Sequence, residues 1–71
     1  MDIRRQVGKN IKKLREKRGW SQEELSFEAE LHRTYVSGVE RGVRNPTVTV
    51  LQKIATALGV SASKLLIGTK V

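Results

Sequence analysis

The stretch SQEELSFEAELHRTYVSGVERGVRN, residues 21–45, has the pattern of two short amphipathic helices joined by a tight corner. Ser21 followed by Glu24 forms a capping-box pair, in which each side chain accepts from a free backbone amide at a helix start. The second helix is predicted from His32 to about Arg41. The apolar residues spaced to bury one side of the two helices are Leu25, Ala29, Val36 and Val39.

The second helix also carries polar residues that lie outside its predicted buried side. These residues, which remain available for contact with another molecule, are Arg33, Thr34, Tyr35, Ser37 and Arg41. Two helices that cross in this way, with polar side chains on the second, form the geometry that inserts a helix into a DNA major groove. The segment therefore predicts a helix-turn-helix.

A longer helix with one apolar stripe is predicted before this pair. Its apolar residues, which recur at helical spacing, are Ile3, Val7, Ile11 and Leu14. Gly19 ends this helix, and Trp20 is expected to pack beneath the corner.

Two further helices are predicted after the pair. Gly42 stops the second helix of the pair, and the proline of the following turn, Pro46, cannot continue a helix. Thr47 is a candidate N-cap for a helix that Gly59 ends. Its apolar residues are Val48, Leu51, Ile54, Ala55 and Leu58. Ser61 can cap a last short helix, which contains Ala62, Leu65 and Leu66.

Length and charge narrow the classes of protein to which this chain can belong. The 71 residues fit one compact five-helix, all-α domain over 1–71, with its core at about 7–67. The 14 Lys and Arg residues against 7 Asp and Glu residues give a net charge of +7, which favours a polyanionic partner. Most of the basic residues come before position 19 and most of the acids between 23 and 30, so the molecule is expected to be electrically two-sided.

The residue inventory argues against an enzyme and against a cofactor. The chain has no cysteine, one histidine (His32) and one aspartate (Asp2), so neither a catalytic triad nor a metal centre can be assembled. No apolar run approaches the ~18 residues of a membrane span, and charged residues directly after Met1 leave no room for a signal peptide. We expect a cytoplasmic protein that binds no small-molecule ligand.

Several motifs together point to one family. They are Ser21-Gln22-Glu23-Glu24-Leu25, Tyr35-Val36-Ser37, Glu40-Arg41-Gly42, Arg44-Asn45-Pro46 and the segment from Leu51 to Ser61. In these motifs the chain resembles the XRE-type family of phage-repressor and Cro-like helix-turn-helix regulators. Residues 31–41 are most similar to the controller proteins of restriction–modification systems, which are homodimers that regulate transcription of their own gene and of the endonuclease gene.

The resemblance implies a set of base-contacting residues at the start and outer side of the recognition helix. Arg33 can donate two hydrogen bonds to guanine, and Thr34 offers a hydroxyl and a methyl group. Tyr35 either stacks on sugar or phosphate or belongs to the core. Gly38 lies where relatives often carry a long polar base reader; it either lets the helix sit deeper in the groove or has no role.

A second set is expected to contact the DNA backbone. It consists of Gln22, Ser37, Arg41, Arg44 and Asn45. Gln22 opens the first helix of the pair, where free amides and the positive end of the helix dipole favour a phosphate. Ser37 either binds a phosphate or satisfies a carbonyl of its own helix.

Other residues are predicted to have structural roles. Arg15 and Glu40 resemble the ion pair that links the first helix to the third in this family. The corner, where the family commonly has glycine because the backbone tends to need positive φ, carries Glu30 here, at a cost of roughly 1 kcal/mol. A homodimer interface is expected at three apolar residues beyond the needs of the core, which are Val60, Leu65 and Ile67.

The leading hypothesis is therefore a homodimeric, sequence-specific transcriptional regulator on a palindromic operator in double-stranded DNA. The alternative is a protein-interaction module, such as an antitoxin-like or coactivator-bridging domain, that uses the same fold to hold another protein. RNA binding is disfavoured because the few aromatic residues provide no stacking platform.

Overall fold

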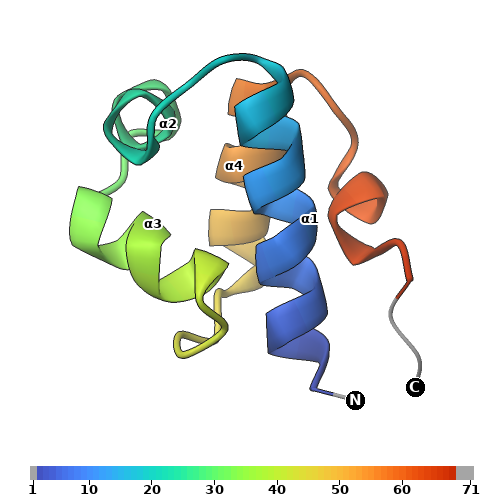
Figure 1. Cartoon of the computed structure of the whole chain (residues 1–71). Coiled ribbons are helices and arrows are strands. Elements are labelled where there is room, and N and C mark those ends of the chain that lie inside the picture. Colours follow the sequence, from blue (N-terminus) through green and yellow to red (C-terminus); the bar gives the residue numbers. More distant parts are fainter. Residues whose placement is uncertain (1, 69–71) are drawn as a thin grey trace.

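In the described part of the chain, residues 2–68 of a computed structural model, four α-helices and one short 3-10 helix follow one another (Figure 1). Their bounds are α1 (Ile3–Lys17), α2 (Gln22–Ala29), α3 (Arg33–Glu40), α4 (Val48–Leu58) and η1 (Ala62–Leu66). α1 packs against α3, α4 and η1, while α2 packs against α3 and α4. The predicted pair of short helices is thus present as α2 and α3, and α1 and α4 support it.

The prediction of a fifth α-helix is wrong, because η1 is a single short 3-10 helix. Ser61 does not cap it; its hydroxyl forms a hydrogen bond with the hydroxyl of Ser63, at 2.9 Å, and makes no side-chain cap. The amide of Asn10 in α1 donates to the carbonyl oxygens of Leu65 and Ile67, at 2.9 and 2.7 Å. These carbonyls are therefore satisfied by α1 and need no further helical turn.

At the starts of α2 and α4, side chains take up free backbone amides as the sequence predicts. Ser21 and Glu24 form the capping box at α2, with hydrogen bonds of 3.1 and 2.9 Å, and Thr47 caps α4. α1 begins after Asp2, whose carboxylate accepts from the backbone amide of Arg4 at 3.0 Å. The side-chain hydrogen bond from Arg4 holds the pKa of Asp2 below its ordinary value.

The corner between α2 and α3 has the backbone conformation that the family usually gives to glycine. Glu30 has φ 57° and ψ 46°, which is left-handed. The Leu31 amide donates to the Ser26 carbonyl at 2.8 Å, closing the end of α2. The turn therefore keeps the left-handed geometry although its residue is not glycine, and the protein tolerates a strain of roughly 1 kcal/mol at Glu30.

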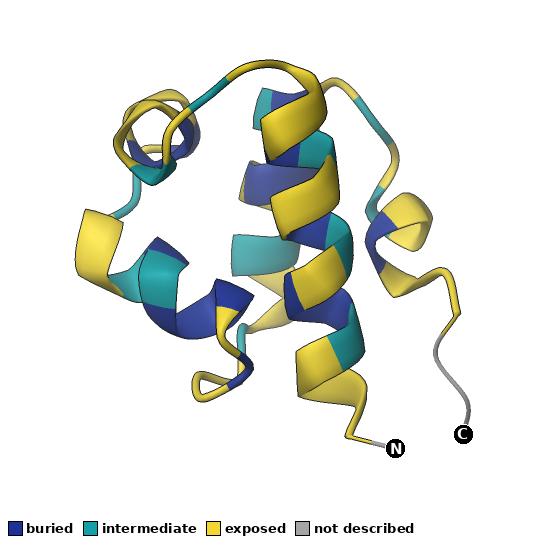
Figure 2. Ribbon diagram, viewed as in Figure 1, coloured by how far each residue is buried: buried dark blue, intermediate teal, exposed yellow. Residues whose placement is uncertain are grey.

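The helices turn their buried sides inward, as the dark blue segments of Figure 2 show. The predicted apolar residues of α2 and α3 are all buried; they are Leu25, Ala29, Val36 and Val39. Of the apolar residues predicted for α4, all lie in that helix, but Val48 is 83% exposed. Val48 is the first residue of α4, and the side of that helix packed against the core begins with Val50 and Leu51.

α1 and α3 approach each other closely at a glycine that the sequence analysis did not single out. A Cβ atom on Gly8 would lie 2.5 Å from the carbonyl oxygens of both Val39 and Glu40. Such distances are incompatible with a side chain, so the glycine sets the separation of the two helices. The available signal was a mid-helix glycine directly after Val7 in the apolar stripe.

Candidate nucleic-acid interface

The predicted recognition helix, α3, has one buried side and one accessible side. Arg33 and Thr34 in its first turn are exposed, and so is Arg41 directly after its end. Tyr35 and Ser37 are half-buried. The structure thus places Arg33, Thr34, Tyr35 and Ser37 on one short helix, whose opposite side belongs to the core. The other predicted DNA-contacting residues lie outside it: Arg41, Arg44 and Asn45 follow α3, and Gln22 opens α2. The DNA contacts themselves stay predictions.

The prediction that Gly38 itself contacts a base is wrong, because Gly38 is buried beneath the side chain of Arg44. A Cβ atom at this position would collide with Cγ of Arg44. The backbone amides of Val43 and Arg44 both donate to the Gly38 carbonyl, at 3.0 and 3.2 Å. The guanidinium carbon of Arg44 lies 5.5 Å from the centroid of the Tyr35 ring. Arg44 therefore comes from the following turn and covers the middle of α3.

A further arginine reaches the end of α3 from another helix. Gly42 has φ 76°, and a Cβ atom there would lie 2.7 Å from Cγ and 3.0 Å from Cα of Arg5. Glycine is thus required at this position both by the backbone conformation and by space. Arg5, which the sequence analysis did not select, lies at the start of α1 against the turn that follows Arg41.

A buried ion pair fixes α3 to α1. Arg15 donates from Nε to Oε2 of Glu40 at 2.7 Å and from Nη2 to Oε1 at 3.0 Å. Both side chains are nearly inaccessible, with exposed fractions of 10% for Arg15 and 2% for Glu40. The hydrogen bond to Glu40 raises the pKa of Arg15 above its ordinary value. This is the ion pair that the resemblance to the XRE-type family implies.

The hydrogen bonds around the Glu40 carboxylate also include a residue of α2. The side-chain nitrogen of Gln22 donates to Oε1 of Glu40 at 3.0 Å, and Nη1 of Arg15 donates to the Trp20 carbonyl at 2.7 Å. The sequence analysis assigned Gln22 to the DNA backbone and missed this structural role. One carboxylate therefore joins the three helices that carry and support the recognition element.

The C-terminal face differs from the predicted dimer interface. Leu65 is fully buried within the chain, so its assignment to that interface is wrong: η1 turns this side chain into the core. Val60 is half-buried against the core. Ile67 is 57% exposed, and Leu66 and Ile3 are also exposed. The accessible apolar surface is thus shifted toward the start of α1.

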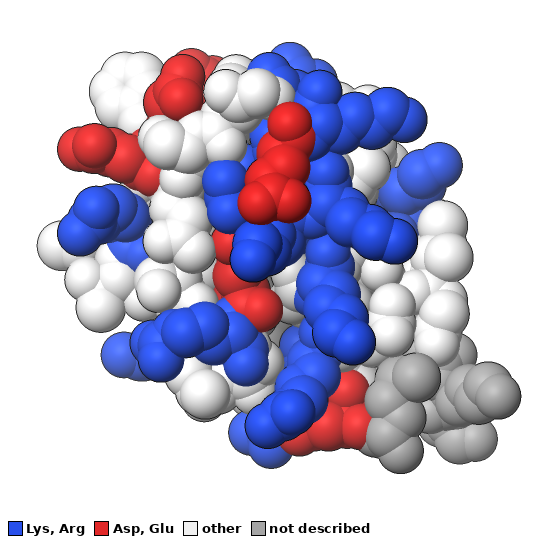
Figure 3. Space-filling view, viewed as in Figure 1, with Lys and Arg blue, Asp and Glu red and all other residues white. Residues whose placement is uncertain are grey.

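Charge is distributed unevenly over the surface, as predicted. Figure 3 shows Lys and Arg along α1 and over α3 with the turn after it, and Asp and Glu over α2 at the upper left, with further acidic side chains among the basic ones over α1. On this acidic side Phe27 is 79% exposed, which no sequence pattern indicated. The guanidinium carbon of Arg18 lies 4.4 Å from the Trp20 ring centroid, in the segment between α1 and α2.

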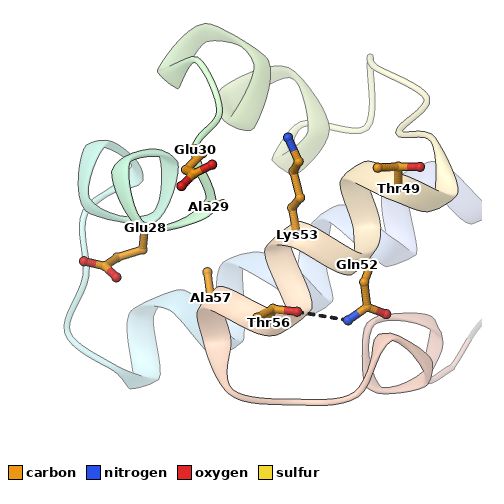
Figure 4. Close-up of a pocket in the computed structure, with 8 residues that line it drawn as sticks. All are labelled: Glu28, Ala29, Glu30, Thr49, Gln52, Lys53, Thr56 and Ala57. Atoms are coloured by element: carbon orange, nitrogen blue, oxygen red, sulfur yellow. Dashed lines mark hydrogen bonds between the residues drawn. The ribbon is translucent and has the colours of Figure 1, made fainter.

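An open groove of about 500 Å³ lies between α2 and α4 (Figure 4). Glu28 and Glu30 lie on its α2 side, opposite Lys53 of α4, and all three are exposed.

Among residues 2–68 no group of three His, Cys, Asp or Glu side chains could hold a metal ion. None of the helices described is long and apolar enough to cross a membrane.

The comparisons with known proteins agree with this geometry. The family described as Helix-turn-helix matches residues 11–65. The chain belongs to this family. Control protein C.BamHI of Bacillus amyloliquefaciens is 46% identical over 66 residues, which cover 92% of this chain and 82% of that protein.

Two solved structures extend the likeness. The restriction–modification controller protein C.AhdI from Aeromonas hydrophila has a TM-score of 0.86 and 42% identity, over 87% of this chain and 94% of that chain. The controller protein C.Esp1396I, solved as a tetramer in complex with its natural 35 base-pair operator, has a TM-score of 0.83 and 38% identity. That alignment covers 92% of this chain and 86% of that chain.

Proposed function

We propose that this chain is a sequence-specific, DNA-binding transcriptional regulator of the restriction–modification controller type, acting in the cytoplasm. The observation that carries the proposal is the exposed, arginine-containing start of α3, held in place by the buried network around Glu40. A recognition helix must be rigid because base readout depends on the placement of a few donor atoms. The high identity to control proteins supports the same function.

In this proposal the contacts divide between bases and backbone. Arg33 and Thr34 reach base edges in the major groove, with Tyr35 beside them. The backbone contacts come from Ser37, Arg41, Arg44, Asn45 and the amide end of α2 at Gln22. Arg5 adds a positive charge next to the end of α3. Phosphate contacts of this kind fix the register of the helix on the duplex.

We further propose a two-fold homodimer that pairs through the exposed apolar surface around Ile67, with Val60 at its edge. A small domain has a limited core, so a partner subunit would add stability. A symmetric dimer would present two copies of α3 about 34 Å apart, matching half-sites one helical turn apart.

Selection of bound sequences from a random pool of double-stranded DNA tests this function. We expect enrichment of a palindromic site, with binding that weakens steeply as salt rises and sedimentation of a dimer at the concentration where binding saturates. Saturated specific binding by a monomer would exclude the dimer. Failure to enrich any sequence would favour the protein-interaction alternative.

Arg33→Ala is expected to reduce affinity for the selected site by about 1–3 kcal/mol, because the bidentate donor to guanine is lost. Preference should relax at one base pair of each half-site, while binding to random DNA changes little. Titration of wild type and variant against selected, singly substituted and random duplexes measures this. Lys64→Ala, which removes an exposed charge from η1 on the other side of α1, is the matched control. Equal weakening on all three duplexes would make Arg33 a phosphate contact.

A further inference from the structure

The glycine in the middle of α3 has no explanation in its own backbone. Gly38 lies within a regular helix, and it is absent from the glycines of positive φ, which in the described chain are Gly19, Gly42, Gly59 and Gly68. A glycine in a helix interior is less favourable than alanine, so its presence calls for a reason outside the helix.

The reason lies in the space above it. The stem of Arg44 packs on Gly38, since a Cβ atom there would collide with Cγ of Arg44 and lie 3.5 Å from its Cβ and Cδ. Cγ is in the middle of the side chain, so Arg44 could not yield by moving its tip alone; it would need another rotamer. The two backbone hydrogen bonds to the Gly38 carbonyl hold the turn in place beneath this contact.

The contact between Arg44 and Gly38 determines where the Arg44 guanidinium lies. Residues four and three positions apart on a helix share a side, so Thr34, Gly38 and Arg41 lie along one side of α3. Arg44 lies over Gly38, the middle one of these three positions, and its guanidinium carbon lies 5.5 Å from the centroid of the Tyr35 ring. The turn thus supplies the long side chain that α3 lacks at its centre.

We propose that Gly38 is a positioning residue: its missing side chain forms the seat that holds Arg44 against Tyr35 on the DNA-facing side of α3. The proposal rests on the proposed function for its effect on DNA, whereas the seat itself is a property of the free protein. Gly38 touches no DNA in this arrangement and acts through Arg44.

The free protein gives the first test. In wild type, the Tyr35 ring should shift the NMR signals of the Arg44 δ-protons upfield. Gly38→Ala should abolish this shift while the circular dichroism of the helices and the melting temperature stay the same or rise, since alanine favours the helix. An Arg44 signal unchanged in Gly38→Ala would overturn the seat, whether or not the protein binds DNA.

A double-mutant cycle on the selected operator gives the second test. Gly38→Ala and Arg44→Ala should each lower affinity about tenfold, as expected for a lost contact near 1.4 kcal/mol. The double variant should match Arg44→Ala to within about twofold, because the glycine then has nothing to position. Additive losses would show instead that the alanine methyl obstructs DNA directly. Absence of operator binding by wild type would refute the proposed function and leave the NMR result standing.

Discussion

Glu40→Ala is expected to lower the free energy of unfolding by about 3–5 kcal/mol, the largest effect that we predict for this chain. The substitution removes the acceptor of three hydrogen bonds, two from Arg15 and one from Gln22. The Arg15 guanidinium would keep its bond to the Trp20 carbonyl but would remain charged and buried without a counter-ion. An unpaired charge in that position is far more costly than the lost pair itself.

Urea unfolding followed by circular dichroism measures this loss. Glu28→Ala, which removes an exposed carboxylate from α2, is the matched control and should stay within about 0.5 kcal/mol of wild type. Below its lowered melting temperature, Glu40→Ala should keep the base preference of wild type, because Glu40 positions α3 and is too buried to contact a base. A variant of normal stability with an altered base preference would contradict the structural role.

Features of this fold that depend on a few neighbouring residues could be predicted from the sequence. The capping box of Ser21 and Glu24 is such a feature, since both groups belong to one helical turn. The left-handed corner at Glu30 followed from the family pattern despite the unfavourable residue type. Helical spacing likewise predicted the buried sides of α2 and α3, because burial on a short helix follows directly from its periodicity.

The errors arose where distant segments meet. Leu65 has the same apolar character whether it faces a second subunit or the core, and only the packing of η1 on α1 and α4 decides between them. Gln22 opens α2 and Glu40 ends α3, so no local pattern indicated their hydrogen bond. The contact of Arg44 with Gly38 depends on the path of the turn after α3, which residue spacing does not specify.

Gly8→Ala is expected to destabilise the protein by about 3 kcal/mol, at the upper end of the range for overpacking. Helix propensity favours alanine by about 1 kcal/mol, so the sign depends on the space around the new methyl group. That methyl group would meet two backbone carbonyl oxygens at 2.5 Å and the Glu40 carbonyl carbon at 2.9 Å. Backbone atoms inside α3 cannot move singly, so α1 and α3 would have to separate.

Gly38→Ala is the matched control, because it makes the same chemical change inside a helix. There the new methyl group would displace a side chain, Arg44, that is exposed and can adopt another rotamer. Urea unfolding should therefore show a loss for Gly8→Ala and none for Gly38→Ala. Since Gly8 packs at the point where α3 meets α1, Gly8→Ala should also disturb the pair of Arg15 and Glu40. Equal stability of the two variants would mean that the helices can separate freely, and that α3 is not rigidly held.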